Sequence, residues 1–446
     1  MKTYHRFGFV TKRLLPILLR YQFQRRNPSS AAFLKTCVDF RTTLHDLGPT
    51  YIKLGQLLSA RPDLVGMELA TELRKLLDQI PIIPFDEIED VLQRTWNNNP
   101  KKIFRKIEHT PLATASIAQV HKATMHNGHI VAIKVQRPGI RAVITHDLVI
   151  FKQLTFLLDK ILPIKGIQFS YIYQEFASWI QNELDFQTEG RRAERFAQNA
   201  KDLPGIRVPS IFWDYSSSTV LVMDYLEGYT VNNILSEMKR QKVTSIYDVK
   251  LDFAIDPDTL IHRLITAIAQ QLLTDKYFHG DLHPANIIIQ KNNTVAFVDF
   301  GIIGTLNNEE QTQILLALIA IVQGDPQAMV KIISSLIADP LTQKDMTKLH
   351  QTFADELHKL HEDENGSISL NHIVTVMLGL TQQYSFKWSS GFLLAIKSIG
   401  QIDTLCQLIG LHSSLVELLQ PHMEKAIAAS FSTTFSQETL YKSLLD

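Results

Sequence analysis

Cysteines and long hydrophobic runs are scarce in this sequence. Cys37 and Cys406 are the only cysteines among 446 residues and lie far apart, which argues against a disulfide framework and favours a reducing compartment such as the cytoplasm. The apolar run at residues 14–19 contains a proline and no small-residue cleavage site, so a secretory signal is not expected. The stretch 314–322 is too short to span a bilayer, and 366–386 is interrupted by polar residues. We therefore expect no transmembrane helix.

Net charge is also absent, because 45 Lys and Arg residues cancel 45 Asp and Glu residues. The total charge thus gives no reason to expect a nucleic-acid partner. The distribution is uneven, since eight basic residues and no acidic residue precede Asp39. These are Lys2, Arg6, Lys12, Arg13, Arg20, Arg25, Arg26 and Lys35. The rest of the chain has 37 basic residues, 45 minus these eight, against 45 acidic ones.

The basic N-terminal segment predicts a helix over about Thr11–Arg26, with apolar residues gathered toward one side. These are Leu14, Leu15, Leu18 and Leu19. Such a helix could lie on an anionic membrane surface, gaining about 1 kcal/mol for each basic group near the lipid. A solvated terminus is the alternative, and the residues do not decide between the two.

The body of the chain has the composition of a folded protein, with 45% hydrophobic and 20% charged residues. Its length suggests two or three domains. Helical patterns cover 51–60, 147–162 and 170–199, and almost everything beyond Thr305. Strand patterns cover 116–123, 129–136, 218–225, 286–290 and 294–299. Asn127-Gly128 between the first two strands predicts a β-hairpin.

One candidate cation lies on the second strand of this hairpin. Lys134 ends the sequence Val-Ala-Ile-Lys at 131–134. A lysine on a rigid strand could reach a bound phosphate, although most strand lysines are simply solvated.

Candidate oxygen ligands follow much later in the chain. Asp281 lies in His-Gly-Asp-Leu-His-Pro-Ala-Asn at 279–286, which ends at Asn286, and Asp299 opens Asp-Phe-Gly after the predicted hairpin. Mg²⁺ prefers oxygen ligands and retains substrate phosphates, so Asn286 and Asp299 suit a metal while Asp281 is left near a phosphoryl acceptor. This order and spacing match a protein-kinase catalytic loop and its Asp-Phe-Gly sequence. A zinc site at His279 and His283 is the weaker alternative, because no third His or Cys lies nearby.

Two features of ordinary protein kinases are missing. Where a glycine-rich phosphate loop would precede Lys134, the chain has Pro-Leu-Ala-Thr-Ala-Ser-Ile-Ala-Gln-Val at 111–120. Alanine restricts the backbone and carries a methyl group, so nucleotide is expected to sit differently under this loop. No Ala-Pro-Glu follows Asp299, so an ordinary protein substrate is not expected.

These motifs resemble the UbiB (AarF) family of atypical protein-kinase-like proteins. Lys53-Leu-Gly-Gln56 resembles its K-x-G-Q signature, residues 111–121 its alanine-rich loop and Glu183-Leu-Asp185 its E-x-D motif. The resemblance runs in order from about Leu47 to Gly304, with a weaker likeness around 394–408. K-x-G-Q together with the alanine loop is specific, whereas residues 279–286 alone are shared with aminoglycoside and choline kinases.

The resemblance implies an α+β, two-lobed protein-kinase-like fold. It has an N-terminal helical extension that carries K-x-G-Q and lays Lys53 and Gln56 across the active site, and its C-terminal region is mostly helical. We divide the chain into a basic, possible membrane-surface segment at 1–46, the extension at 47–106, an N-lobe with inserted helices at 107–228, and a C-lobe with a helical tail at 229–446.

The resemblance also implies ATP (or ADP) and Mg²⁺ binding, ATPase or kinase activity, and a role in ubiquinone biosynthesis at a membrane. Asp281 would be catalytic, Asn286 and Asp299 would hold Mg²⁺, Lys134 would contact phosphates and pair with Glu189, and Glu183 and Asp185 would face Lys53. The nucleotide-binding loop would be Leu112, Ala113, Thr114, Ala115, Ser116, Ile117, Ala118, Gln119 and Val120. As ordinary alternatives, the three acidic helix residues could be solvated, and Lys53 with Gln56 could be an exposed pair.

Two departures from the family pattern are present. Thr114 replaces an alanine that is common in the loop, and the final segment 420–446 is polar where many bacterial relatives have membrane helices. We therefore expect peripheral attachment at the cytoplasmic face of the membrane. Expected partners are nucleotide, a quinone precursor or lipid, an anionic membrane surface and other quinone-biosynthesis proteins. The alternatives are a small-molecule kinase of the aminoglycoside or choline type and a nucleotide-gated, lipid-binding scaffold with no phosphoryl acceptor.

Overall fold

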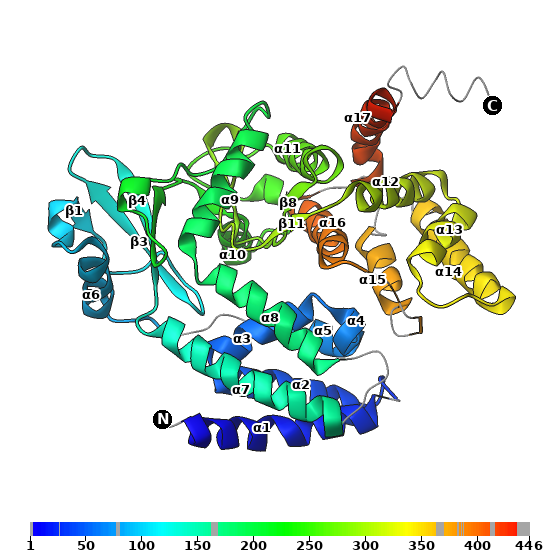
Figure 1. The fold of residues 1–446 in the computed structure, drawn as a ribbon. Helices are drawn as coiled ribbons and strands as arrows, with labels where there is room; N and C mark the ends of the chain where they lie inside the picture. The colour runs from blue at the N-terminus through cyan, green and yellow to red at the C-terminus, as the bar shows by residue number, and fades with distance from the viewer. Residues whose placement is uncertain are drawn as a thin grey trace. The chain divides into compact units, whose positions relative to one another are not determined.

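The computed structural model describes residues 3–25, 27–76, 81–161, 168–362, 370–380, 383–384, 386, 388–410 and 415–434. It is about 64% helical and 12% strand. The chain forms two compact units (Figure 1). The first unit contains residues 1–193, 209–225 and 381–383, and the second contains 194–208, 226–380 and 384–446.

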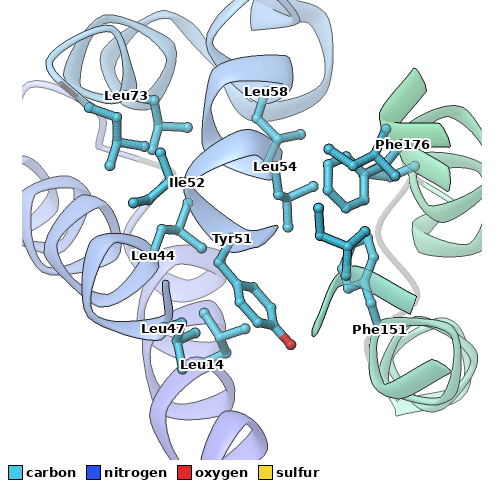
Figure 2. Packing of buried hydrophobic residues seen from close by; sticks show 14 of the residues in the cluster. Leu14, Leu44, Leu47, Tyr51, Ile52, Leu54, Leu58, Leu73, Phe151 and Phe176 are labelled. Atoms are coloured by element: carbon cyan, nitrogen blue, oxygen red, sulfur yellow. The ribbon is translucent and has the colours of Figure 1, made fainter. Parts of the chain in front are cut away.

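A layer of helices makes up much of the first unit. These helices are α1 (Thr3–Gln24), α2 (Ala31–Leu47), α3 (Pro49–Ser59), α4 (Pro62–Val65), α5 (Met67–Leu73), α7 (Ile140–Ile161) and α8 (Phe169–Glu183). Gly48, at φ 97°, separates α2 from α3, and Pro49 starts α3, where its missing N–H is not needed. The helices share one apolar core, in which Tyr51 and Leu54 of α3 lie near Phe151 and Phe176 (Figure 2).

Helix α1 is an integral part of this core. It starts earlier than the predicted Thr11, and the predicted end at Arg26 lies outside the described residues. Val10, Leu14 and Ile17 are buried. The Nε atom of Arg6 lies 3.0 Å from Oδ1 of Asp147, whose side chain is only 3% exposed. The side of α1 that an amphipathic membrane helix would insert into lipid therefore packs largely against the protein itself.

An antiparallel sheet completes the first unit. Its strand order is β1 (Phe104–Ile107), β3 (Ala118–Met125), β4 (Ile130–Gln136) and β6 (Val220–Asp224), with β2 (Ala113–Thr114) also paired to β3. The β3–β4 hairpin forms where it is predicted, with Gly128 at φ 87° in the turn. Helix α6 (Phe85–Trp96) contributes Ile88 and Leu92 to a second core with the inner strand residues.

The predicted helix at 170–199 is two helices. Helix α8 ends at Glu183, and α9 (Phe186–Asn199) begins after a break at Leu184 and Asp185. Asp185 causes the restart, because its carboxylate accepts hydrogen bonds from the Gln187 backbone N–H at 3.1 Å and the Thr188 hydroxyl at 2.8 Å. A side chain of this kind satisfies backbone donors at a helix start.

The second unit is mainly helical, as the sequence predicts beyond Thr305. Small sheets pair β5 (Ile206–Arg207), β10 (Thr294–Phe297), β9 (Ile287–Gln290) and β7 (Tyr229–Thr230) in that order, and β8 (Tyr277–His279) with β11 (Ile303–Thr305). The helices are α10 (Val231–Gln241), α11 (Pro257–Ala269), α12 (Asn308–Gln323), α13 (Pro326–Leu336), α14 (Gln343–Glu362), α15 (Leu370–Leu380), α16 (Ser390–Ile409) and α17 (Leu415–Thr434). A π-helical turn at Gln270–Asp275 follows α11.

Among the described helices, α16 alone is long and apolar enough to cross a membrane by length and composition. About 67% of its most apolar 18-residue window is buried inside the fold. A buried core helix meets the same criteria. The segments 366–386 and 420–446, considered above from the sequence, lie partly outside the described residues.

Candidate active site

A buried ion pair joins the sheet of the first unit to α9. The Lys134 ammonium on β4 lies 2.7 Å and 2.8 Å from the two carboxylate oxygens of Glu189. Both side chains are at most 11% exposed. Lys134 faces Val120 on β3 and Leu221 on β6, so both of its neighbouring strands fix its position. Removing two charges from water is costly, and a retained buried pair is therefore a candidate functional feature.

A second ion pair links the K-x-G-Q helix to the E-x-D motif. The Lys53 ammonium on α3 lies 3.2 Å from Oε2 of Glu183 at the end of α8, and 5.5 Å from the centre of the Trp179 ring. Gln56 is half-buried one turn further along α3. Gly55 between them allows close packing, since a Cβ there would lie 2.2 Å from Cδ1 of Leu76.

The alanine-rich loop folds back on itself as a tight hairpin. Ala113 and Thr114 pair with Val120 and Gln119, and the Ala115 N–H donates to the Ala118 carbonyl at 2.9 Å. Leu112 and Ala113 are exposed, and Thr114, Ala115 and Val120 are half-buried. A ligand could therefore contact the backbone at this tip and these exposed or half-buried side chains.

The other side chains of the predicted nucleotide loop are part of the protein interior. Ser116, Ile117, Ala118 and Gln119 are buried. The Gln119 amide is engaged twice with the backbone of Ile83, accepting from its N–H at 2.9 Å and donating to its carbonyl at 3.2 Å. Gln119 thus fastens the segment before α6 to the sheet.

Arg137 is a loop-holding residue that the sequence did not single out. Its guanidinium Nε donates to the Ala115 carbonyl at 2.8 Å, and its backbone N–H donates to the Ile117 carbonyl at 2.9 Å. The sequence signal for this role was the position of Arg137 directly after β4. The end of β4 lies beside the alanine-rich loop that precedes the β3–β4 hairpin, so a residue there can contact the loop.

His279 organises the catalytic-loop motif of the second unit. Its ring is fully buried among Phe196, Phe297 and Phe300, and burial lowers the pKa of His279. Its Nδ1 accepts from the Asp281 backbone N–H at 3.1 Å, so the remaining nitrogen, Nε2, carries the proton that donates to the Val298 carbonyl at 3.1 Å. His279 therefore ties Asp281 to the strand end just before Asp299.

Asn286 and Asp299 lie at the same end of the β9–β10 hairpin. Ile287 is paired with Phe297, and the Val298 N–H donates to the Asn286 carbonyl at 3.0 Å, which extends the pairing by one step. Asp299 follows at φ 61°, a left-handed conformation that non-glycine residues seldom adopt. Such local strain is common at functional sites.

This donor set fits a magnesium ion. The Asn286 Nδ2 donates to the Asp281 carbonyl at 3.0 Å, which leaves its side-chain oxygen as the atom available to a cation. Among the described residues, no group of three or more His, Cys, Asp or Glu side chains could hold a metal ion. Two protein oxygens still suit Mg²⁺, because this ion retains several waters and binds through substrate phosphates.

Asp281 is held by α16, a contact that the sequence motifs do not predict. The Lys397 ammonium and the Gln401 amide nitrogen each lie 3.3 Å from Oδ1 of Asp281. Burial alone would raise the pKa of Asp281, but Lys397, assisted by His279 and Gln401, brings it below its usual value. The weak family likeness around 394–408 was the only sequence signal.

A groove in the first unit lies along α7 and α8 and contains none of the predicted site residues. Its volume is about 910 Å³. The apolar lining includes Leu148, Phe156 and Tyr173, the basic residues are Arg141 and Lys152, and none of the described residues that line it is acidic. Such a volume and lining are typical of small-molecule sites.

Comparison with known proteins identifies the class and then the family. The structure of the Mycobacterium tuberculosis protein Rv3197 in complex with erythromycin resembles this fold with a TM-score of 0.56 at 19% identity, covering 82% of this chain and 90% of that one. The two proteins thus share a fold. A family model described as the ABC1 atypical kinase-like domain matches residues 75–333. The chain belongs to this family, which includes the UbiB proteins.

Two named relatives are similar over most of this chain. The chloroplastic protein ACTIVITY OF BC1 COMPLEX KINASE 7 of Arabidopsis thaliana is 27% identical over 390 residues, which is 87% of this chain and 54% of that protein. The probable protein kinase UbiB of Marinobacter nauticus is 27% identical over 390 residues, 86% of this chain and 69% of that protein. This chain therefore spans between 54% and 69% of the length of these relatives.

Proposed function

We propose that this protein is an ATP- and Mg²⁺-dependent atypical kinase or ATPase that supports ubiquinone biosynthesis at a membrane surface. The observation that carries the proposal is the placement of Asn286 and Asp299 at the same end of the β9–β10 hairpin, where the Val298 N–H donates to the Asn286 carbonyl, in a chain of a kinase-like family. The Lys134–Glu189 pair supports it independently, since a buried lysine held by a carboxylate is the phosphate-binding arrangement of kinases.

Each residue group has a chemical task in this proposal. Lys134 would bind the α- and β-phosphates, with Glu189 keeping its ammonium in place. Asn286 and Asp299 would hold Mg²⁺, which supplies neutralisation of phosphate charge when bound. Asp281 would accept the proton of the attacking hydroxyl or orient a water. Lys53, Gln56 and Glu183 would act as family-specific regulators, with Asp185 fixing the start of α9.

The nucleotide assignment is tested by Asp299→Asn. We expect this variant to lose the rise in melting temperature that Mg-ATP or Mg-ADP gives the wild-type protein, because one metal-binding carboxylate is removed. Asp339→Asn, an exposed position after α13, is the matched control and should keep the full rise. An unchanged rise in Asp299→Asn would remove the assignment of Asp299 as a metal ligand.

The quinone role is tested in cells that lack the protein. Wild-type chain should restore quinone levels, whereas Asp281→Asn at equal abundance should not, because turnover at the site is required. Restoration by both would separate the cellular role from catalysis. A metabolite screen that finds one soluble alcohol rapidly phosphorylated would instead support the small-molecule kinase alternative.

The lipid-binding scaffold is the second candidate, and the α7–α8 groove is the observation that favours it. Its apolar lining with Arg141 and Lys152 suits an amphiphile that carries an acidic group. ATP turnover measured with and without anionic liposomes and a phenolic precursor separates the candidates. An enzyme should show turnover that Asp281→Asn abolishes, whereas a pure scaffold should bind lipid with no Asp281-dependent turnover.

A further inference from the structure

The catalytic-loop motif contains no lysine or arginine. Residues 281–286 read Asp-Leu-His-Pro-Ala-Asn, without Lys or Arg. The cation beside Asp281 comes from α16, where the Lys397 ammonium lies 3.3 Å from Oδ1 of Asp281 and 3.5 Å from the Gly280 carbonyl oxygen. Lys397 and Asp281 are 116 residues apart in the sequence, so tertiary packing alone creates this contact.

A set of contacts fixes α16 against the loop. The Gln401 side-chain oxygen accepts from the Leu282 backbone N–H at 3.2 Å, while its amide nitrogen faces Oδ1 of Asp281. The buried Ser398 hydroxyl lies 3.2 Å from the His279 carbonyl oxygen. Residues 397, 398 and 401 occupy one side of the helix, as expected for i, i+1 and i+4 positions. This side is therefore built around the loop.

The two oxygens of Asp281 have different surroundings. Oδ1 faces the ammonium of Lys397 and the amide of Gln401. Oδ2 lies 3.5 Å from Nδ2 of Asn286. These contacts to both oxygens favour one orientation of the Asp281 carboxylate.

We propose that Lys397, assisted by Gln401, is a positioning residue that orients the Asp281 carboxylate for phosphoryl transfer. The inference rests on the proposed function, because it assigns Asp281 a role in turnover. It extends the functional site from the kinase-like motifs to the helical C-terminal region. Orientation of a reacting group acts on the chemical step more than on nucleotide affinity.

The test compares Lys397→Met, Lys397→Arg and the control Lys331→Met on α13, where Lys331 is exposed. In Mg-ATP turnover, Lys397→Met should lower kcat by about tenfold or more while changing KM for ATP by less than about threefold. Lys397→Arg retains the charge and should recover a large part of kcat. Lys331→Met should match the wild type. A purely structural role would not produce this kcat-specific loss with recovery by arginine.

A second measurement does not depend on activity. The melting temperatures of Asp281→Asn, Lys397→Met and the double variant form a cycle, and their changes should be non-additive because the two side chains interact. Equal kcat in Lys397→Met and wild type, or additive melting changes, would overturn the inference. Absence of Asp281-dependent turnover in the wild type would instead refute the proposed function, leaving the melting cycle to decide whether the contact exists.

Discussion

At the scale of single residues, the most informative group is the Lys134–Glu189 pair. Lys134 is 9% exposed and Glu189 6%, so neither charge is well hydrated. The Lys134 ammonium also lies 5.3 Å from the centre of the Phe186 ring, which adds a favourable cation–π contact. Removing one charge therefore leaves the other buried without this ion pair.

Glu189→Gln is expected to destabilise the protein by about 3 kcal/mol, the cost of breaking a buried pair. Urea unfolding of the variant and the wild type measures the difference. The same change at Glu87, an exposed glutamate on α6, should leave stability within about 0.5 kcal/mol. Equal stability of Glu189→Gln and wild type would show that the pair is solvated in solution.

At the scale of elements, the start of α16 lies directly against β11. A Cβ at Gly391 would lie 2.2 Å from the Thr305 backbone oxygen, which is closer than any side chain tolerates. Backbone atoms cannot rotate out of the way as a flexible side chain can. Glycine is thus required for α16 to reach the depth at which Lys397 and Gln401 meet Asp281.

Gly391→Ala is expected to destabilise the protein by about 1–3 kcal/mol, as overpacking does, and to lower ATP turnover by shifting Lys397. Calorimetry and turnover of the same preparation measure both effects. Gly8→Ala is the control, because a Cβ at Gly8 on α1 would meet nothing within 4 Å. Gly8→Ala should stabilise the protein by about 0.5–1 kcal/mol, because alanine is favoured over glycine in a helix interior. A neutral Gly391→Ala would contradict the close approach.

At the scale of the whole molecule, the basic N-terminal segment is both part of the fold and a source of surface charge. Arg6 bridges to Asp147 on α7 and donates to the Leu47 carbonyl at 2.7 Å. Arg13 and Arg20 form exposed pairs with Asp46 and Asp39, which contribute little to stability. These exposed basic groups remain suited to an anionic surface even though the apolar side of α1 is occupied.

Deletion of residues 1–24 is expected to cost more than about 4 kcal/mol, because Val10, Leu14 and Ile17 each bury apolar area worth about 1.5–3 kcal/mol. Asp147 would also lose its partner. Unfolding curves of the truncated and full chains measure this. A truncated chain as stable as the full one would mean that α1 is not part of the core.

The effect of surface charge on membrane binding is tested separately from its effect on folding by neutralising Lys12 and Lys35, which are both exposed. The double change to Gln should leave the melting temperature unaltered and weaken sedimentation with anionic vesicles, and high salt should weaken it in the wild type as well. Vesicle binding that persists in high salt would indicate a hydrophobic attachment instead.

Local patterns predicted much of the fold. Alternating β-branched residues and Asn127-Gly128 located the β3–β4 hairpin, and the spacing of Asp281, Asn286 and Asp299 identified the kinase-like loop. The same reasoning treated 170–199 as one helical stretch, because the break depends on Asp185 binding the backbone ahead of it. It also included Gln119 in the nucleotide loop, although its amide is engaged with Ile83.

The sequence by itself determined the family and the chemical types of the site residues, because both depend on residue identity and short spacings. Only the tertiary structure decided which side chains surround them. The approach of Lys397 to Asp281, the burial of α1 and the fastening of Gln119 join residues that are far apart in sequence. Such contacts arise from how helices and strands pack to bury apolar area, and no local pattern records that packing.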